Sequence, residues 1–488
     1  MKSGKKTIAA FAAALILFSL AACGGGMSSG GDSVGSAGAQ GSESVKDNVL
    51  LGDEEKLVYS TDKEFLMYPY GGVPGKLRIY DKNGGIVEDN IPISDEQLEE
   101  YYKQIKDAGM NMTAGGYINM TYADYIRGLK VCEKIGLKMM VYDQSLVALL
   151  MNDKLSDAVV VDQVLSNYSE MLDSPAFAGI SVWDEPSVAK LGEFKTALER
   201  WNIIAEGKIF YINLFPSIAF SSSTYGTFED YIKTFVEKVD VDYVCYDHYP
   251  LQTSGKNNYL RDDFLYNLAT VKANSDGRRT FTVLQSVQYG GMHRALSGAA
   301  DVTFQVYSAL CYGFEGFGWF TFWPPVPNDG ATTFGDAAYD RQTNQPTDTY
   351  YFIKDGLNEI RKLEDVYFNF AWKGTKTVIG AENANGGENY DFALAAFTET
   401  ATPRIESVSA EQDTVIGVFE DKDGNDGFLV VNYTEPSANL ENKVVMKLKD
   451  CTKAAVWENG VQKVYKVENG WLTLHQKSGD GFFVVPIK

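Results

Sequence analysis

The sequence predicts an α/β protein, a (β/α)8 TIM barrel followed by an antiparallel β-domain. From residue 65 to about residue 370, short apolar segments alternate with segments of helical periodicity, which is the pattern of parallel strands joined by crossover helices. The alternation passes through eight strand–helix units, enough for a sheet to close on itself without an exposed edge. After Trp372 the pattern changes to strands separated by short turn sequences, which favours a separate antiparallel domain.

Helix boundaries are clearest in the first half of the barrel. Ser94 is followed three residues later by Gln97, a capping box that begins a helix, and Gly109 is expected to end it. A second helix is expected from 121 to 136, and the glycines near 83–85 indicate a hairpin inserted before the first helix. The strands expected in this half are 65–70, 111–117, 137–142 and 177–183.

The second half of the barrel shows the same alternation of strands and helices. A helix is expected to begin at Thr227, where the spacing to Asp230 again suits an N-cap. Two longer helices are expected over 301–312 and 349–363. The strands expected in this half are 209–214, 241–246, 281–284 and 316–322.

The domain boundaries follow from these patterns. We expect the barrel to cover 48–370 and the β-domain to cover 371–488, with turns at 423–425 and 459–460. Two roles are open for the β-domain: packing on the barrel for stability, or sugar binding.

The N-terminus carries an export signal. A short basic head precedes an apolar run, Thr7 to Leu20, that is too short to span a bilayer comfortably. The segment Leu20-Ala21-Ala22-Cys23 resembles the lipobox of bacterial lipoproteins. This resemblance implies a signal peptide over 1–22, a lipidated Cys23, and attachment to the outer face of the bacterial cell membrane. Residues 23–47 are rich in Gly, Ser and Ala, as in a flexible tether.

Composition limits the possible partners. The net charge of −21 argues against nucleic acid or an anionic membrane surface as a partner, so membrane contact is expected only through the N-terminal lipid. The cysteines beyond Cys23 lie in apolar patterns without metal-like spacing, which predicts buried free thiols. The three histidines are far apart in sequence, and neither a metal nor a cofactor is expected.

Acidic and aromatic residues gather where the barrel strands end. TIM-barrel sites lie at the C-terminal ends of the strands, and carboxylates follow the third strand (Asp143), the fourth (Asp184 and Glu185) and the sixth (Asp247). Glycoside hydrolysis uses two carboxyl groups, and aromatic rings and amides suit sugar rings and hydroxyls. The residues expected to contact a carbohydrate substrate are Asp184, Trp183, Asn213, His248, Tyr249, Gln285, Tyr117, Trp319 and Trp323.

One segment resembles a known catalytic motif. Trp183-Asp184-Glu185-Pro186 is similar to the acid/base segment of the clan A glycoside hydrolases, where Asn-Glu-Pro is usual, and the resemblance implies that Glu185 is the proton donor. Asp184 in place of the Asn puts a second charge beside Glu185, which would raise the pKa of that carboxyl by repulsion. Further stretches resemble a bacterial group related to the family 42 β-galactosidase barrel: 108–111, 213–216, 246–250 and 314–323.

The chain departs from that family after the seventh strand. Clan A places a nucleophilic Glu there, but residues 284–289 read Leu-Gln-Ser-Val-Gln-Tyr. Glu315 precedes the eighth strand, hence lies at the opposite end, and is expected to form a structural ion pair. The retaining mechanism is therefore not carried over. Three explanations stay open: Asp247 as general base of an inverting reaction, Asp143 in the same role, or a barrel that binds glycans without cleaving them.

Other roles are open for these residues and for the protein. Asp184 could equally hold a loop in place. Asp247 and His248 could cap the sixth strand, and Gln285 could only orient the substrate. A solute-binding lipoprotein would share the export signal, but it needs two lobes, and eight successive strand–helix units argue against that.

Overall fold

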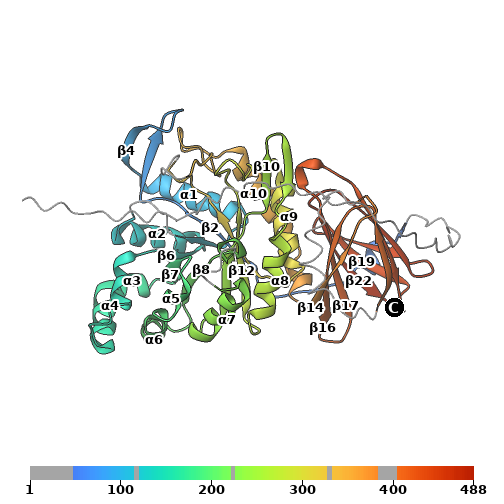
Figure 1. Ribbon diagram of the computed structural model, residues 1–488, viewed down its shortest axis with the longest axis horizontal. Helices are drawn as coiled ribbons and strands as arrows, with labels where there is room; N and C mark the ends of the chain where they lie inside the picture. The colour runs from blue at the N-terminus through green and yellow to red at the C-terminus, as the bar shows by residue number, and fades with distance from the viewer. Residues whose placement is uncertain (1–47, 115–119, 221–225, 327–331, 383–403) are drawn as a thin grey trace, which may run out of the picture.

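The computed structural model describes residues 48–114, 120–220, 226–326, 332–382 and 404–488. Two bodies lie side by side, an α/β barrel and a β-domain formed by the C-terminal part of the chain (Figure 1). This architecture confirms the predicted fold class.

Eight parallel strands form the barrel sheet, in the order β2-β13-β12-β9-β8-β7-β6-β5. The two ends of that order meet, because the backbone N–H of Asn111, just before β5, donates to the Met67 carbonyl oxygen of β2 at 3.1 Å. The barrel strands are β2 (Leu66–Tyr70), β5 (Met112–Ala114), β6 (Lys138–Val141), β7 (Phe177–Asp184), β8 (Ile209–Leu214), β9 (Tyr243–Asp247), β12 (Arg279–Gln285) and β13 (Gly316–Phe320).

Helices surround this sheet, and their ends follow the predicted caps. Ser94 and Gln97 form the capping box of the first helix, and Thr121 and Asp124 form one at the second, which ends at Gly136 with a left-handed φ of 70°. The helices are α1 (Asp95–Asp107), α2 (Tyr122–Ile135), α3 (Gln144–Leu150), α4 (Asp157–Leu172), α5 (Val188–Leu191), α6 (Phe194–Ile204), α7 (Phe228–Lys238), α8 (Phe264–Asn274), α9 (Ala299–Leu310), α10 (Asp348–Arg361) and α11 (Glu364–Tyr367).

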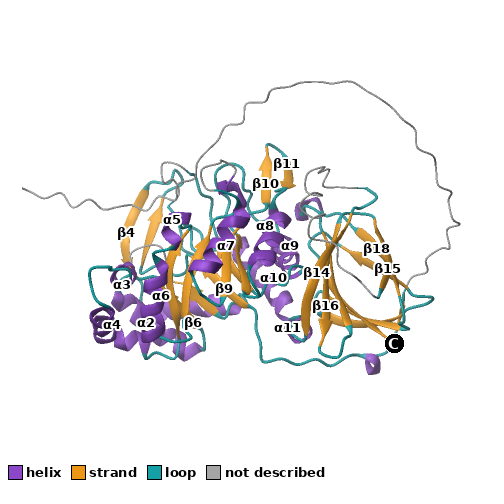
Figure 2. Cartoon of the chain, turned by 60° about the horizontal axis from the view of Figure 1, so that its bottom comes forward, coloured by secondary structure: helices purple, strands orange, loops and turns teal. Residues whose placement is uncertain are grey.

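Two hairpins interrupt the barrel pattern. The first, β3 (Lys76–Tyr80) with β4 (Ile86–Pro92), is the insertion that the glycines near 83–85 predict. The second, β10 (Leu251–Ser254) with β11 (Asn257–Leu260), follows β9 and was not predicted. Figure 2 shows this second hairpin projecting beside α8.

The β-domain contains two antiparallel sheets, ordered β1-β20-β19-β22-β17-β16-β14 and β15-β18-β21. Apolar residues such as Phe428, Met446 and Leu472 are fully buried and form its core. Its strands are β14 (Phe370–Val378), β15 (Ile405–Ala410), β16 (Thr414–Asp421), β17 (Asp426–Asn432), β18 (Asn442–Leu448), β19 (Lys453–Glu458), β20 (Val461–Lys466), β21 (Trp471–Gln476) and β22 (Gly481–Ile487).

The first described residues belong to the β-domain rather than the barrel. The short strand β1 (Val49–Leu50) pairs with β20, and the Leu51 N–H donates to the Val464 carbonyl oxygen at 2.8 Å. The assignment of residues 48–51 to the barrel is therefore wrong. The described part of the chain begins at residue 48 on the β-domain, continues into the barrel, and returns to the β-domain at Phe370.

The two bodies share an apolar interface at α9. Phe304 of α9 packs against Tyr433, with ring centroids 5.3 Å apart, and the Trp372 indole N–H donates to the Cys311 carbonyl oxygen at 2.9 Å. In the described part of the chain Cys132, Cys245 and Cys311 are buried free thiols, as expected, whereas Cys451 is a free thiol that is only partly buried. None of the described helices combines the length and the apolar composition that a bilayer crossing needs.

Candidate active site

The end of β7 presents two consecutive carboxylates at the C-terminal end of the barrel. The pairing of β7 with β8 shifts register between Ser181 and Trp183, a β-bulge that re-aims the side chains beyond it. Asp184 then pairs with Asn213, and the Glu185 N–H donates to the Asn213 carbonyl oxygen at 2.8 Å. Glu185 has a φ of 50°, in a region that residues other than glycine rarely adopt and that concentrates at functional sites.

The side-chain amide of Asn213 joins carboxylates from two different strands. Its Nδ2 atom donates to Asp184 Oδ1 at 3.1 Å and to Asp247 Oδ1 at 2.8 Å. Because both acceptor oxygens lie close to one nitrogen, they are less than about 6 Å apart. On the other side of the amide, Asn213 Oδ1 lies 3.8 Å from Cys245 Sγ, and this contact keeps the NH2 group directed at the carboxylates.

Asp184, Glu185 and Asp247 lie near one another at the C-terminal end of the barrel, and we call them the acidic cluster. Asp184 is exposed, Glu185 is half-buried, and Asp247 is 5% exposed. Burial by the surrounding protein is nevertheless the largest influence on the pKa of each. Solvent therefore reaches Asp184 and part of Glu185, while Asp247 lies beneath the surface.

The surroundings raise the pKa of the three carboxyl groups to different extents. Burial raises the pKa of Asp184, and hydrogen bonds from Asn213 and Tyr70 oppose that rise. Burial and the charge of Asp184 raise the pKa of Asp247 to about 7. Burial and the charges of Asp247 and Asp184 raise the pKa of Glu185 well above its ordinary value. Neighbouring carboxyl groups with separated pKa values are typical of acid–base sites.

Aromatic rings lie beside Asp247. Tyr249 hydrogen-bonds the Asp247 carboxylate, and its ring centroid lies 5.3 Å from that of Phe320. Phe320 also contacts Tyr70 at 6.3 Å. Tyr249 and Phe320 are half-buried, so part of each ring faces solvent. Such rings next to carboxylates can cover the apolar face of a sugar.

The predicted residues Asn213 and Tyr249 thus lie in contact with the acidic cluster. Asp143 and Trp183 instead contact residues close to them in the sequence. Asp143 accepts from the backbone N–H groups of Ser145 and Leu146, at 2.8 and 3.0 Å, and so caps α3. The Trp183 ring lies under Lys190, whose Nζ is 4.5 Å from the ring centroid. Tyr117 lies outside the described residues.

Two polar residues predicted to bind substrate are structural instead. His248 is 1% exposed and its Nε2 lies 2.8 Å from Asp263 Oδ1, so it faces the start of α8 rather than the acidic cluster. Gln285 is fully buried. Its side chain accepts from the Leu251 N–H at 3.0 Å and donates to the Leu251 and Arg294 carbonyl oxygens. Both predictions of substrate contact are wrong, because the hydrogen bonds of these side chains are directed into the protein.

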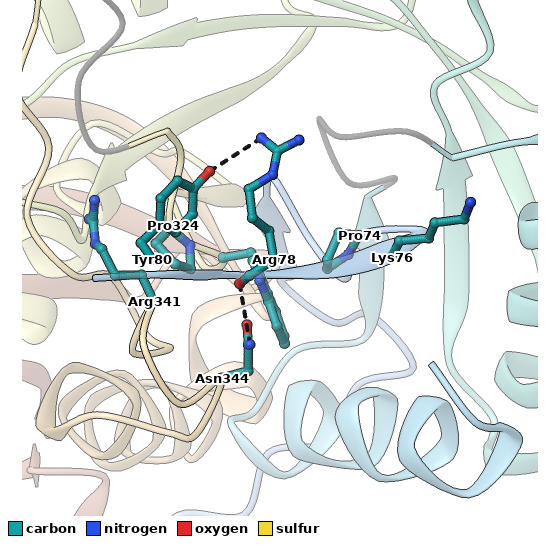
Figure 3. A pocket seen from close by; sticks show the side chains of 8 residues that line it. Pro74, Lys76, Arg78, Tyr80, Pro324, Arg341 and Asn344 are labelled. Atoms are coloured by element: carbon teal, nitrogen blue, oxygen red, sulfur yellow. Dashed lines mark hydrogen bonds between the residues drawn. The ribbon is translucent and has the colours of Figure 1, made fainter. Parts of the chain in front are cut away.

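The two tryptophans after β12 are also buried. Trp319 has no exposed surface and belongs to the barrel core, so the predicted sugar contact is wrong. Trp323 is 7% exposed and stacks on Tyr339 with centroids 4.2 Å apart. It contributes to a shallow groove on the rim of the barrel (Figure 3), which is lined by Pro74, Lys76, Arg78, Tyr80, Trp323, Pro324, Arg341 and Asn344.

Glu315 behaves as predicted, since its Oε2 forms an ion pair with Arg279 Nε at 2.8 Å. Tyr70 was recognised from the sequence as a residue at the end of the first barrel strand, and it hydrogen-bonds Asp184. Sequence reasoning missed Tyr289 and His293, which lie in the loop after β12, where no periodicity fixes direction. Within the described ranges no group of three or more His, Cys, Asp or Glu side chains is arranged to hold a metal ion.

Comparisons with known proteins support the architecture. No family model matches the sequence, and no curated protein matches it significantly. A solved structure described as a glycoside hydrolase superimposes with a TM-score of 0.51 at 13% identity, covering 91% of this chain and 97% of its own. A GH27 β-L-arabinopyranosidase from Geobacillus stearothermophilus gives 0.46 at 10% identity, covering 87% and 96%. An endo-1,4-β-mannanase from Eisenia fetida gives 0.38 at 12%, covering 61% and 91%. At these identities the likeness shows the fold alone.

Proposed function

We propose that the protein is a glycoside hydrolase that acts on a carbohydrate at the acidic cluster. The observation that carries this proposal is the meeting of Asp184, Glu185 and Asp247, from the ends of two barrel strands on either side of β8, in surroundings that raise the pKa of all three. Hydrolysis of a glycosidic bond needs a protonated carboxyl to donate to the leaving oxygen and an ionised one on the other side of the sugar. The half-buried rings of Tyr249 and Phe320 would hold that sugar.

We assign Glu185 as the proton donor and Asp247 as its partner. Burial and the charges of Asp247 and Asp184 raise the pKa of Glu185 well above its ordinary value, which favours its protonated form. The charge of Asp247 influences Glu185 more than that of Asp184, its neighbour in sequence. Asp247, with its pKa raised to about 7, is partly ionised near neutrality and can act as the base.

A second pairing within the same function has its own support. Asp184 and Asp247 share Asn213, which brings their oxygens within about 6 Å, nearer to the spacing of retaining than of inverting glycosidases. In this pairing Asp184 is the ionised group and Asp247 the acid. Asp247 takes part in both pairings. The Asp184→Asn variant distinguishes between them, because only the second pairing needs the Asp184 carboxylate.

Glu185→Gln tests the first assignment. We expect kcat for glycoside hydrolysis to fall about 10²–10⁴-fold, with sugar affinity nearly unchanged, because the amide fills the same space but cannot donate a proton with the same ease. The measurement is product release from a panel of oligosaccharides and aryl glycosides, with binding followed by calorimetry.

Glu315→Gln is the matched control, since that glutamate lies at the opposite end of the barrel and is ion-paired with Arg279. Unchanged turnover in Glu185→Gln would remove Glu185 from the mechanism. Sugar binding by the wild-type protein without product release would favour the second candidate function, a glycan-binding lipoprotein without catalysis, which the absence of a carboxylate at Gln285 in the seventh barrel strand motivates.

We also propose that Cys23 is lipidated and that the mature protein is anchored on the outer face of a bacterial membrane. The support is the segment 20–23 with the Gly- and Ser-rich residues after it. Cells fed an alkyne-tagged fatty acid are expected to label the wild-type chain and not Cys23→Ser, and only the wild type should sediment with membranes. Equal labelling of both would contradict the assignment. The finer likeness to the family 42 barrel group rests on sequence segments alone and remains part of this proposal.

A further inference from the structure

The loop between β12 and α9, residues 286–298, supports the aromatic residue Tyr249 beside the acidic cluster. Tyr289 stacks on His293, with centroids 4.0 Å apart and planes at 12°. Tyr249 meets both rings edge-on, at 5.6 Å and 6.0 Å. Since Tyr249 hydrogen-bonds Asp247, the stacked pair fixes the ring that in turn holds a carboxylate of the acidic cluster.

The residue after His293 ties this loop to the β-domain. The Arg294 guanidinium donates to Glu435 Oε1 at 2.8 Å and to Asp301 Oδ2 at 2.9 Å. The three side chains are 6%, 8% and 0% exposed, in the order Arg294, Glu435, Asp301. Glu435 lies just after β17 and caps the short 3-10 helix Pro436–Ala438.

The backbone of Arg294 is held by the barrel at the same time. Its N–H donates to the Leu251 carbonyl oxygen at 3.1 Å, and its own carbonyl oxygen accepts from Gln285 Nε2 at 2.7 Å. Arg294 therefore joins β10, β12 and the β-domain at one point, directly beside His293. A displacement of its guanidinium would be transmitted to the stacked rings through one peptide bond.

We propose that Glu435 is a positioning residue for the proposed hydrolase site. Through Arg294 it holds the stacked rings of Tyr289 and His293 in contact with Tyr249, and Tyr249 in turn hydrogen-bonds Asp247. The inference rests on the proposed function and gives the β-domain a part in the site. It also accounts for a carboxylate of the β-domain that is buried against a barrel loop.

The first test needs no enzymatic activity. Hydrogen exchange of the full chain is compared between wild type, Glu435→Gln and Arg294→Lys. We expect exchange of the Tyr289, His293 and Arg294 amides, which donate within this loop and to Leu251, to rise about 10-fold or more in both variants. Glu364→Gln, which breaks a partly buried pair with Arg361, is the control and should leave these amides unchanged. Unchanged protection in both test variants overturns the proposal.

The second test measures catalysis. The loss of the Tyr249 hydrogen bond removes an interaction that lowers the pKa of Asp247, so the limb of the pH–kcat profile that reports Asp247 should move to higher pH in Glu435→Gln. A merely structural role would lower the melting temperature without moving that limb. The titratable groups that act on Asp247, or on which it acts, are Asp184, Glu185, Tyr231, Cys245, Tyr246, Tyr249 and Tyr289.

Glu435→Asp, which keeps the charge, is expected to restore the profile in part. A lowered melting temperature with an unshifted profile in Glu435→Gln contradicts the positioning role. If the wild-type protein cleaves no glycoside, the proposed function fails, while the exchange measurement still decides whether Glu435 positions the loop.

Discussion

Replacing Asp247 by Asn is expected to lower kcat for glycoside hydrolysis about 10²–10⁴-fold. Asp247 takes part in both carboxylate pairings, as the base opposite Glu185 or as the acid opposite Asp184. Asn keeps the shape, and its Oδ1 can still accept from Asn213, which donates to Asp247 at 2.8 Å. The loss of activity should therefore come from the loss of a titratable group rather than from a disordered site.

The same substitution is expected to stabilise the fold at neutral pH. The pKa of Asp247 is raised to about 7 in the folded protein and lies near about 3.9 in an unfolded chain. Because the folded state holds this proton more tightly, the free energy of unfolding falls as the pH rises from about 4 to about 7. Asp247→Asn removes this loss, and we expect the free energy of unfolding to increase by on the order of 1–3 kcal/mol at pH 7 and to change little at pH 4.

Thermal unfolding at both pH values, with kcat measured on the same preparations, checks this prediction. Asp240→Asn is the control, since its side chain is 94% exposed at an ion pair with Arg278 and should change neither quantity. Wild-type turnover in Asp247→Asn would exclude both pairings together. A lower melting temperature at pH 7 would show that Asp247 is held as a stabilised anion instead.

The barrel and its acidic cluster were predictable because their signals are local. Capping residues such as Ser94 and Thr121 begin their helices where the sequence places them, and β8 has the predicted bounds. Asp184 ends β7 and Asp247 ends β9, the strands on either side of β8. Parallel strands end at one rim, so counting strands was enough to bring these carboxylates together.

Side-chain direction accounts for the errors at the same rim. Successive residues of a strand point to opposite sides, so Asp247 inside the barrel places His248 outside it, against Asp263. Selecting every polar residue after a strand ignored this alternation. Gln285 was misassigned for a related reason, since its amide pairs with the backbone of Leu251 in a hairpin that the sequence did not reveal.

The contacts between the barrel and the β-domain could not be predicted from the periodicity of the sequence. β1 pairs with a strand more than 400 residues away through only two residues, and no periodicity can be read from so short a segment. The pair of Arg294 and Glu435 joins two loops, each of which looks like an ordinary polar turn. Charge pairs of this kind become visible only when the fold brings distant loops together.

Arg294→Met is expected to destabilise the protein by about 3–5 kcal/mol at pH 7, because it leaves Asp301 and Glu435 buried without their cation. Breaking one partner of a buried pair costs more than the pair itself contributes, since the remaining charges keep their full desolvation cost. The midpoint of thermal unfolding measures the effect. Arg278→Met, whose partners Asp240 and Asp276 are 94% and 82% exposed, should cost only about 0–1 kcal/mol.

Neutralising the remaining partners provides the decisive comparison for Arg294. In the triple variant Arg294→Met, Asp301→Asn, Glu435→Gln no charge remains in this cluster, and we expect most of the lost stability to return. A triple variant as unstable as the single one would mean that the guanidinium acts through packing and backbone hydrogen bonds rather than through charge. The ion pairs would then order the loop without contributing to its stability, and the β-domain would be held to the barrel by its other contacts, such as Phe304–Tyr433 and Trp372–Cys311.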